Sequence, residues 1–68
     1  MPYHVTLPDD RSLSYTEPQT ALAALTEQSG RHATGARLIT GIGSIYVLEG
    51  GRLKLIHGNP DPTLEEAA

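Results

Sequence analysis

The chain has 68 residues, no cysteine and a formal net charge of −3, from eight acidic and five basic residues. This length suits a single domain, and a domain this small buries only about 60% of its unfolded surface. Without cysteine it has neither disulfides nor thiolate zinc sites, so stability must come from a sufficient core or from association. A general nucleic-acid binder is usually basic, and the mild acidity disfavours that class.

The N-terminal residues lack the basic segment and apolar run of a signal peptide. The longest apolar run, residues 45–48, is far shorter than the roughly 20 residues of a membrane span. We therefore expect a soluble, cytoplasmic protein that does not enter the membrane.

Residues 3–7 and 13–15 alternate apolar and polar side chains, which is the pattern of half-buried strands. Proline and two aspartates at positions 8–10 are typical turn residues. The sequence therefore predicts a first hairpin with one apolar face. The pairs predicted for it are Leu7 with Leu13 and Val5 with Tyr15.

Thr16 and Gln19 have the spacing of a capping box, and Pro18 suits the first turn of a helix. The residues that follow are rich in alanine and leucine, which are strong helix formers. Gly30 is a typical left-handed C-cap. The pattern predicts a helix from residue 17 to about residue 29.

Residues 31–43 show no clear period, and their structure stays open. Within them, residues 37–40 fit a short strand or a helical turn equally well. Gly41 and Gly43 flank Ile42 and indicate a bulge or a close approach of two backbones.

Residues 44–49 and 52–57 flank Gly50 and Gly51, a pair typical of a type I′ turn. A second hairpin is therefore predicted. Its predicted pairs are Glu49 with Arg52, Leu48 with Leu53, Val47 with Lys54, Tyr46 with Leu55 and Ile45 with Ile56. One of its faces carries Tyr46, Leu48, Leu53 and Leu55.

The prolines at positions 60 and 62 end the sheet, because proline supplies no donor to a strand ladder. Thr63 and Glu66 again have capping-box spacing, but too few residues follow for a helix that is stable alone. We expect one α+β domain over residues 1–58 and a flexible, proline-rich acidic tail over residues 59–68. The domain has the order ββα(β)ββ, a small antiparallel sheet of two hairpins with one helix packed on one face.

No group of residues predicts a catalytic, metal or cofactor site. His4, His32 and His57 share no local motif with another metal ligand, and we interpret them as surface residues. Residues 41–44 lack the following helix and the lysine of a phosphate-binding loop. The two turn aspartates are explained by the turn, and no serine has the context of a nucleophile. We expect that the chain is not an enzyme and binds no metal or cofactor.

One narrow helix, with Leu22 and Leu25 as its only large apolar residues, covers only part of a four-stranded sheet. The remaining apolar residues are left on a partly uncovered surface, and such patches usually mark an interface. The sequence predicts a protein-binding face or homodimer interface made by Ile42, Ile45, Tyr46, Val47 and Ile56.

We expect a non-catalytic interaction module: an inhibitor, adaptor or accessory subunit that acts by occupying the surface of a protein partner. Phage or mobile-element anti-defence inhibitors, such as anti-CRISPR proteins, include small, acidic, cysteine-free proteins of this type; the chain shares their size and charge but no motif. The alternative is a small winged-helix-like DNA-binding regulator, which requires residues 34–40 to be helical. Its candidate contacts are Arg31, Arg37, Arg52 and Lys54.

Overall fold

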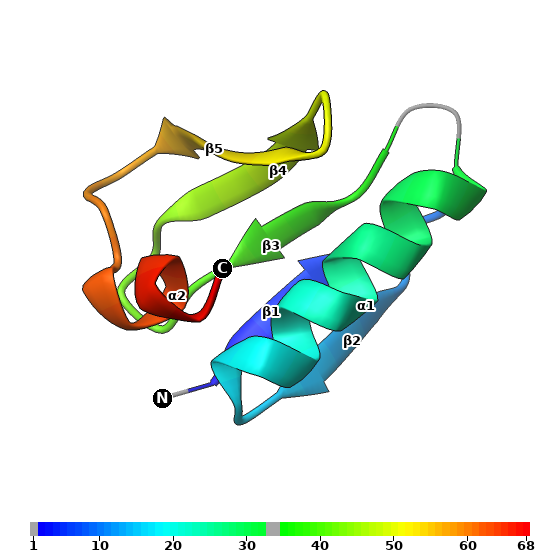
Figure 1. Cartoon of the computed structure of the whole chain (residues 1–68). Helices are drawn as coiled ribbons and strands as arrows, with labels where there is room; N and C mark the ends of the chain where they lie inside the picture. The colour runs from blue at the N-terminus through cyan, green and yellow to red at the C-terminus, as the bar shows by residue number, and fades with distance from the viewer. Residues whose placement is uncertain (1, 33–34) are drawn as a thin grey trace.

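The computed structural model of the chain describes residues 2–32 and 35–68, and its strands form one five-stranded antiparallel sheet (Figure 1). The elements in chain order are β1 Tyr3–Thr6, β2 Ser12–Tyr15, α1 Pro18–Arg31, β3 Arg37–Ile39, β4 Ile45–Glu49, β5 Arg52–His57 and α2 Pro62–Ala67. The strand order is β2-β1-β3-β4-β5, so β3 joins the two hairpins into one sheet. The predicted α+β architecture, with two hairpins and a helix packed on one face, is confirmed.

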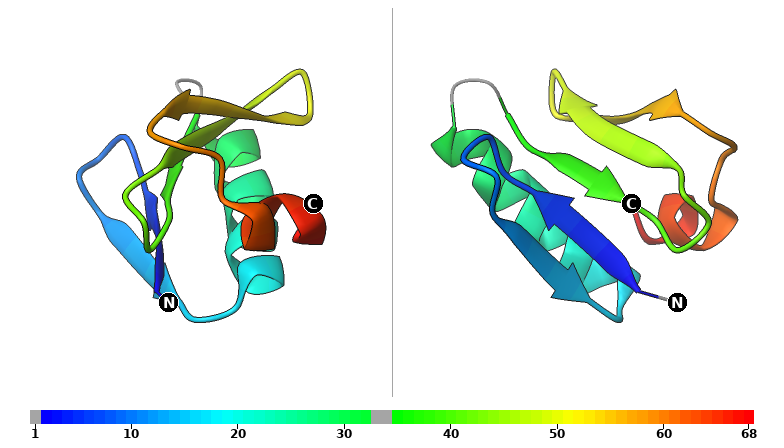
Figure 2. Two further views of the ribbon diagram at one scale, coloured as in Figure 1. Left: turned by 90° about the vertical axis from the view of Figure 1, so that its left-hand side faces the viewer. Right: turned by 180° about the vertical axis from the view of Figure 1, so that it is seen from behind.

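The core lies between the sheet and the two helices, which are on the same side of it (Figure 2). Alternation along the strands turns Val5, Leu38 and Tyr46 toward the helices, and all three are buried. They meet the fully buried side chains of Ala21 and Leu25 from α1. The predicted helix therefore covers one sheet face, and no helix of residues 2–32 and 35–68 lies over the other.

The first hairpin is two residues out of the predicted register. The observed pairs are Tyr3 with Tyr15 and Val5 with Leu13, where the sequence predicts Val5 with Tyr15 and Leu7 with Leu13. The loop has three residues, because the Leu7 N–H donates to the Arg11 carbonyl at 2.8 Å and Asp10 adopts a left-handed conformation with φ 68°. A shift of two residues keeps every side chain on its face of the sheet. The apolar face was therefore predicted correctly and the pairing was not.

Helix α1 ends later than predicted and is capped differently. Its N-cap is Glu17 rather than Thr16, and no side chain makes a capping hydrogen bond. The predicted C-cap, Gly30, lies inside the last turn, and the helix continues to Arg31. The Arg31 guanidinium lies 3.1 Å from the Glu27 carboxylate one turn earlier, and a cation is favourable at a helix C-terminus. The helix therefore continues for one residue beyond Gly30 and ends at Arg31, which these interactions favour.

Residues 37–39, for which the sequence leaves strand and helical turn open, form the central strand β3. Leu38 lies opposite Val5 on one side and Tyr46 on the other, and its side chain is fully buried. A strand here supplies backbone hydrogen bonds to both hairpins. The winged-helix alternative requires helix over residues 34–40 and is contradicted over β3; residues 33 and 34 lie outside the described residues.

Four of the five predicted pairs in the second hairpin are confirmed. Its two turn glycines have φ values of 60° and 79°, as a type I′ turn requires. The fifth pair is wrong, because a bulge between Ile45 and Tyr46 places Ile45 opposite His57. Ile56 is the extra residue on β5.

The C-terminal residues form a helix, in contrast to the flexible tail that the sequence predicts. Asp61 is the N-cap of α2, and its carboxylate accepts a hydrogen bond from the Leu64 N–H at 3.2 Å. Pro62 occupies the first helical turn, where it costs no hydrogen bond. Leu64 is fully buried in the core, and α2 contacts α1. Tertiary packing supplies the stability that so short a helix lacks alone.

Candidate interaction surface

The outer face of the sheet, defined here as the face that points away from both helices, combines apolar and charged side chains. In the right-hand view of Figure 2, β1 and β2 lie in front of α1, with no helix over them. For paired residues its membership follows from the strand register, because residues opposite each other in an antiparallel pair share a face. The unpaired Ile56 is assigned to it because it lines the same pocket as Val47. Its apolar residues are Ile39, Ile45, Val47 and Ile56. Its charged residues include Arg37, Glu49, Arg52 and Lys54.

Three of the five residues predicted to form an interface share the outer face: Ile45, Val47 and Ile56. Ile42 lies in the turn between β3 and β4, where its side chain is 52% exposed. Tyr46 is only 2% exposed and belongs to the opposite face, because it is paired with the buried Leu38. Most of the predicted interface residues therefore lie on the outer face, whereas Ile42 lies in a turn and Tyr46 lies in the core.

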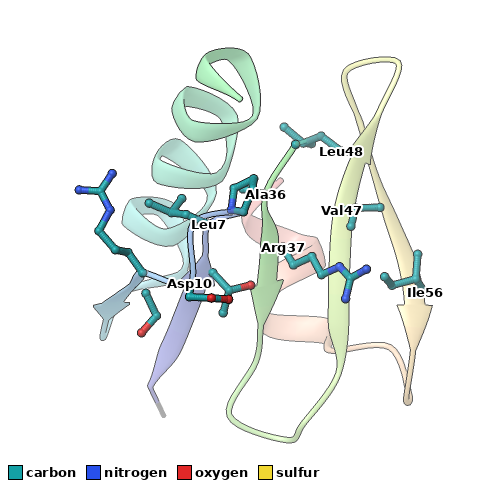
Figure 3. A pocket seen from close by; sticks show the side chains of 12 residues that line it. Leu7, Asp10, Ala36, Arg37, Val47, Leu48 and Ile56 are labelled. Carbon is teal, nitrogen blue, oxygen red and sulfur yellow. The ribbon is translucent and has the colours of Figure 1, made fainter. Parts of the chain in front are cut away.

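A groove with a volume of about 750 Å³ crosses the outer face (Figure 3). One wall is the loop of the first hairpin, and the other consists of Val47, Leu48 and Ile56 from the second hairpin. Between the walls lie Ala36, directly before β3, and Arg37, the first residue of β3. Figure 3 shows the Arg37 side chain extending toward Val47 and Ile56. The groove thus places one guanidinium beside an aliphatic wall.

Arg37 has no acidic partner within residues 2–32 and 35–68 that lies within ion-pair distance. Arg52 likewise has none within these residues, whereas Arg11 Nε lies 2.8 Å from Asp9 and Lys54 Nζ lies 3.2 Å from Glu49. A guanidinium carries five N–H donors in a planar fork that matches a carboxylate. The donors of Arg37 therefore face the groove without a carboxylate from the described part of the chain.

The four residues named for the nucleic-acid alternative do not form one patch. Arg37, Arg52 and Lys54 share the outer face, in β3 and β5. Arg31 lies in the last turn of α1 and is paired with Glu27. The structure therefore brings three of the four together, beside apolar side chains.

A cluster of polar groups links α2 to the sheet through hydrogen bonds. The Tyr46 hydroxyl donates to Glu65 Oε2 at 2.6 Å and accepts a hydrogen bond from the Asp61 N–H at 2.8 Å. Burial raises the pKa of the Tyr46 phenol, and the hydrogen bond to the Glu65 carboxylate raises this pKa further. The sequence alone does not predict this cluster, although an aspartate directly before Pro62 is itself the signal of a helix N-cap. Because its groups satisfy one another inside the fold, we assign the cluster a structural role.

The three histidines lie far apart in the fold. His4 is in β1, His32 is the C-cap of α1 and His57 ends β5. Over residues 2–32 and 35–68, no three or more histidine, aspartate or glutamate side chains come together in a group able to hold a metal ion. In the same part of the chain, no helix has the length and apolar character needed to cross a membrane.

No protein-family model, curated protein or solved structure matches the chain. A function for the chain is therefore inferred from the geometry, burial and charge of the outer face.

Proposed function

We propose that the chain is a non-catalytic protein-binding module that contacts its partner through the outer face of the sheet. The observation that carries the proposal is the presence of Ile39, Ile45, Val47 and Ile56 on a sheet face over which no helix lies. In an antiparallel sheet with one solvated face, that face usually carries polar residues. Aliphatic residues grouped there are typical of an interaction surface.

The composition of the groove supports the same proposal. Interfaces are enriched in arginine and depleted in lysine and acidic residues at their centres. Arg37 lies between an aliphatic wall and the loop of the first hairpin, and Ile56 is 44% exposed beside it. A partner that covered this groove would bury aliphatic surface and give the guanidinium an acceptor.

In this proposal the module works by occupying a surface of its partner, as an inhibitor, adaptor or accessory subunit in the cytoplasm. A phage or mobile-element anti-defence inhibitor belongs to this class. Self-association through the second hairpin stays a prediction, which sedimentation at several protein concentrations tests. DNA binding is the competing proposal, and a gel shift at low salt that disappears steeply with added salt would support it.

The proposal is tested by affinity capture from a lysate of the organism that encodes the chain. Ile45→Asp places a carboxylate on the outer face, and Ala23→Asp makes the same charge change at an exposed position of α1. We expect a folded Ile45→Asp variant to lose about tenfold or more of the captured partner, the effect of removing an interface hot spot. The Ala23→Asp control should capture it normally. Equal capture by the wild-type chain and a folded Ile45→Asp variant would contradict the proposal.

A further inference from the structure

Charge is divided unequally between the two sides of the molecule. The outer face and the loop that borders it carry four of the five basic residues, Arg11, Arg37, Arg52 and Lys54, and three of the eight acidic residues, Asp9, Asp10 and Glu49. The helices and their caps carry Arg31 and the other five acidic residues, Glu17, Glu27, Asp61, Glu65 and Glu66. Although the net charge of the chain is negative, the proposed binding face is therefore on the more basic side of the molecule.

Within this face, the groove combines two kinds of recognition. Val47 and Ile56 offer an aliphatic wall, and the Arg37 side chain extends toward them in Figure 3. An aliphatic side chain seated on this wall would lie beside a guanidinium that lacks a carboxylate partner in residues 2–32 and 35–68. A carboxylate adjacent to that side chain would complete the contact, since arginine binds carboxylates through two parallel hydrogen bonds.

We propose that the groove binds an acidic segment of a partner protein, with an aliphatic side chain against Val47 and Ile56 and a carboxylate on Arg37. This inference rests on the proposed function and names the chemistry of the partner. Charge complementarity between the basic side of the chain and an acidic segment would also guide the encounter.

The same surface is less suited to a nucleic acid. The phosphate backbone of a nucleic acid would lie across Ile45, Val47 and Ile56. Their aliphatic side chains offer it neither hydrogen bonds nor ion pairs. Stacking of bases needs aromatic side chains, but Tyr3 and Tyr46 are buried and face the helices. An acidic protein segment uses both the apolar and the basic parts of the face.

A second copy of the chain is also a poorer partner for this groove. If two outer faces met about a twofold axis, the same patch of each copy would contact the other, and the one excess positive charge of each face would give a weak repulsion and no carboxylate for Arg37. The acidic helix side of another copy would be attracted, but that contact is head-to-tail and would produce open chains of molecules. Growth of the apparent mass with concentration would reveal it.

The test is selection of binding peptides from a random dodecapeptide library displayed on phage. Three baits are compared: the wild-type chain, Arg37→Gln and Arg31→Gln. The two variants change the net charge equally, but Arg31 lies in α1 and is paired with Glu27. Each bait is first shown to be folded by circular dichroism, and selected peptides are then measured by fluorescence polarisation.

We expect the wild-type chain and Arg31→Gln to select peptides in which aspartate or glutamate neighbours aliphatic residues. Such peptides should bind Arg37→Gln about fivefold or more weakly, and replacing their carboxylates by amides should weaken binding to the wild-type chain similarly. Binding should also weaken as salt is raised. This combination of results would establish the carboxylate contact.

Several outcomes would overturn the inference. They are selection of neutral or basic peptides, equal binding of acidic peptides to Arg37→Gln and the wild-type chain, and selection of no peptide at all. Neutral peptides that bind the wild-type chain and not Ile45→Asp would overturn the inference while supporting the proposed function. A DNA duplex shifted by the wild-type chain and Arg31→Gln but not by Arg37→Gln would assign the groove to nucleic acid instead.

Discussion

Tyr46 is a single residue that connects three parts of the fold. Its ring lies in the core beside Leu38. Its hydroxyl makes hydrogen bonds with Asp61, the N-cap of α2, and with Glu65 within α2. The Asp61 N–H, which donates a hydrogen bond to this hydroxyl, is buried. A buried donor without a partner costs about 1–3 kcal/mol of folding stability. The hydroxyl therefore couples the second hairpin to the C-terminal helix.

Tyr46→Phe removes only this hydroxyl. We expect the free energy of unfolding to fall by about 1–3 kcal/mol, because the Asp61 N–H loses its acceptor and Glu65 loses a donor. The matched control is Tyr15→Phe, since the half-buried Tyr15 makes no hydroxyl hydrogen bond within the described residues. That control should change the stability by no more than about 0.5 kcal/mol. Urea denaturation measures both, and equal losses would contradict the role given to Tyr46.

Alkaline pH should destabilise the fold through the same residue. Burial raises the pKa of Tyr3 and of Tyr46 above the usual 10.0, with added contributions from nearby carboxylates. The folded chain therefore holds these phenolic protons more tightly than the unfolded chain does. The stability gained in this way is complete below pH 10.0 and is lost as the pH rises through the raised pKa values.

We expect the free energy of unfolding, measured in urea at a series of pH values, to decrease above about pH 10. Tyr46→Phe, which has one fewer such phenol, should show a shallower decrease. Identical pH dependence in the wild-type chain and the variant would show that Tyr46 does not contribute.

At the scale of elements, the connection between β5 and α2 is packed rather than loose. Gly58 has φ 84°, a conformation that L side chains rarely adopt, and a Cβ added there would lie 3.0 Å from the Ser44 Cα. The Ser44 hydroxyl is a donor to the Asn59 carbonyl. The chain after the last strand is therefore held against the beginning of β4, and this contact directs it toward the position of α2.

Two glycine substitutions should have opposite effects on stability. Gly58→Ala introduces an unfavourable φ and a tight contact with Ser44, and we expect it to lower the free energy of unfolding by about 1–3 kcal/mol. Gly30→Ala should raise it by about 0.5–1 kcal/mol, because Gly30 is in a helix and nothing lies within 4 Å of its added Cβ. Thermal or urea denaturation measures the change in stability of each variant relative to the wild-type chain. Effects of the same sign would contradict this account of the connection.

The elements that the sequence predicts correctly are those governed by local chemistry. Alternation of apolar residues shows which face of β1 is buried, and the glycine pair at positions 50 and 51 fixes the second turn. The first hairpin shows the limit of this reasoning. Its register depends on the left-handed conformation of Asp10, which aspartate tolerates but does not require.

The remaining features depend on contacts between distant parts of the chain. Helix α2 is too short to be stable alone, and the burial of Leu64 against the core is invisible in the local sequence. The three residues of β3 become a strand because two hairpins flank them. The sequence places Tyr46 at the interface because both faces of its hairpin carry apolar residues, and only the packed helices distinguish the two faces.

At the scale of the whole molecule, the fold is one-sided. Both helices lie on one side of the sheet and bury the core, and the aliphatic residues and most of the basic residues remain on the other (Figure 2). The aliphatic residues of the outer face are not among the residues that form this core or pack against it. We therefore attribute them to binding.

Site-specific photo-crosslinking tests this attribution most directly. A benzophenone amino acid is placed at Val47 on the outer face or at Ala23 on the exposed side of α1, and each chain is irradiated in a lysate of the organism that encodes it. We expect discrete protein adducts from position 47, which an excess of unlabelled wild-type chain suppresses, and none of these from position 23. Adducts that form equally from both positions, or only from position 23, would contradict it.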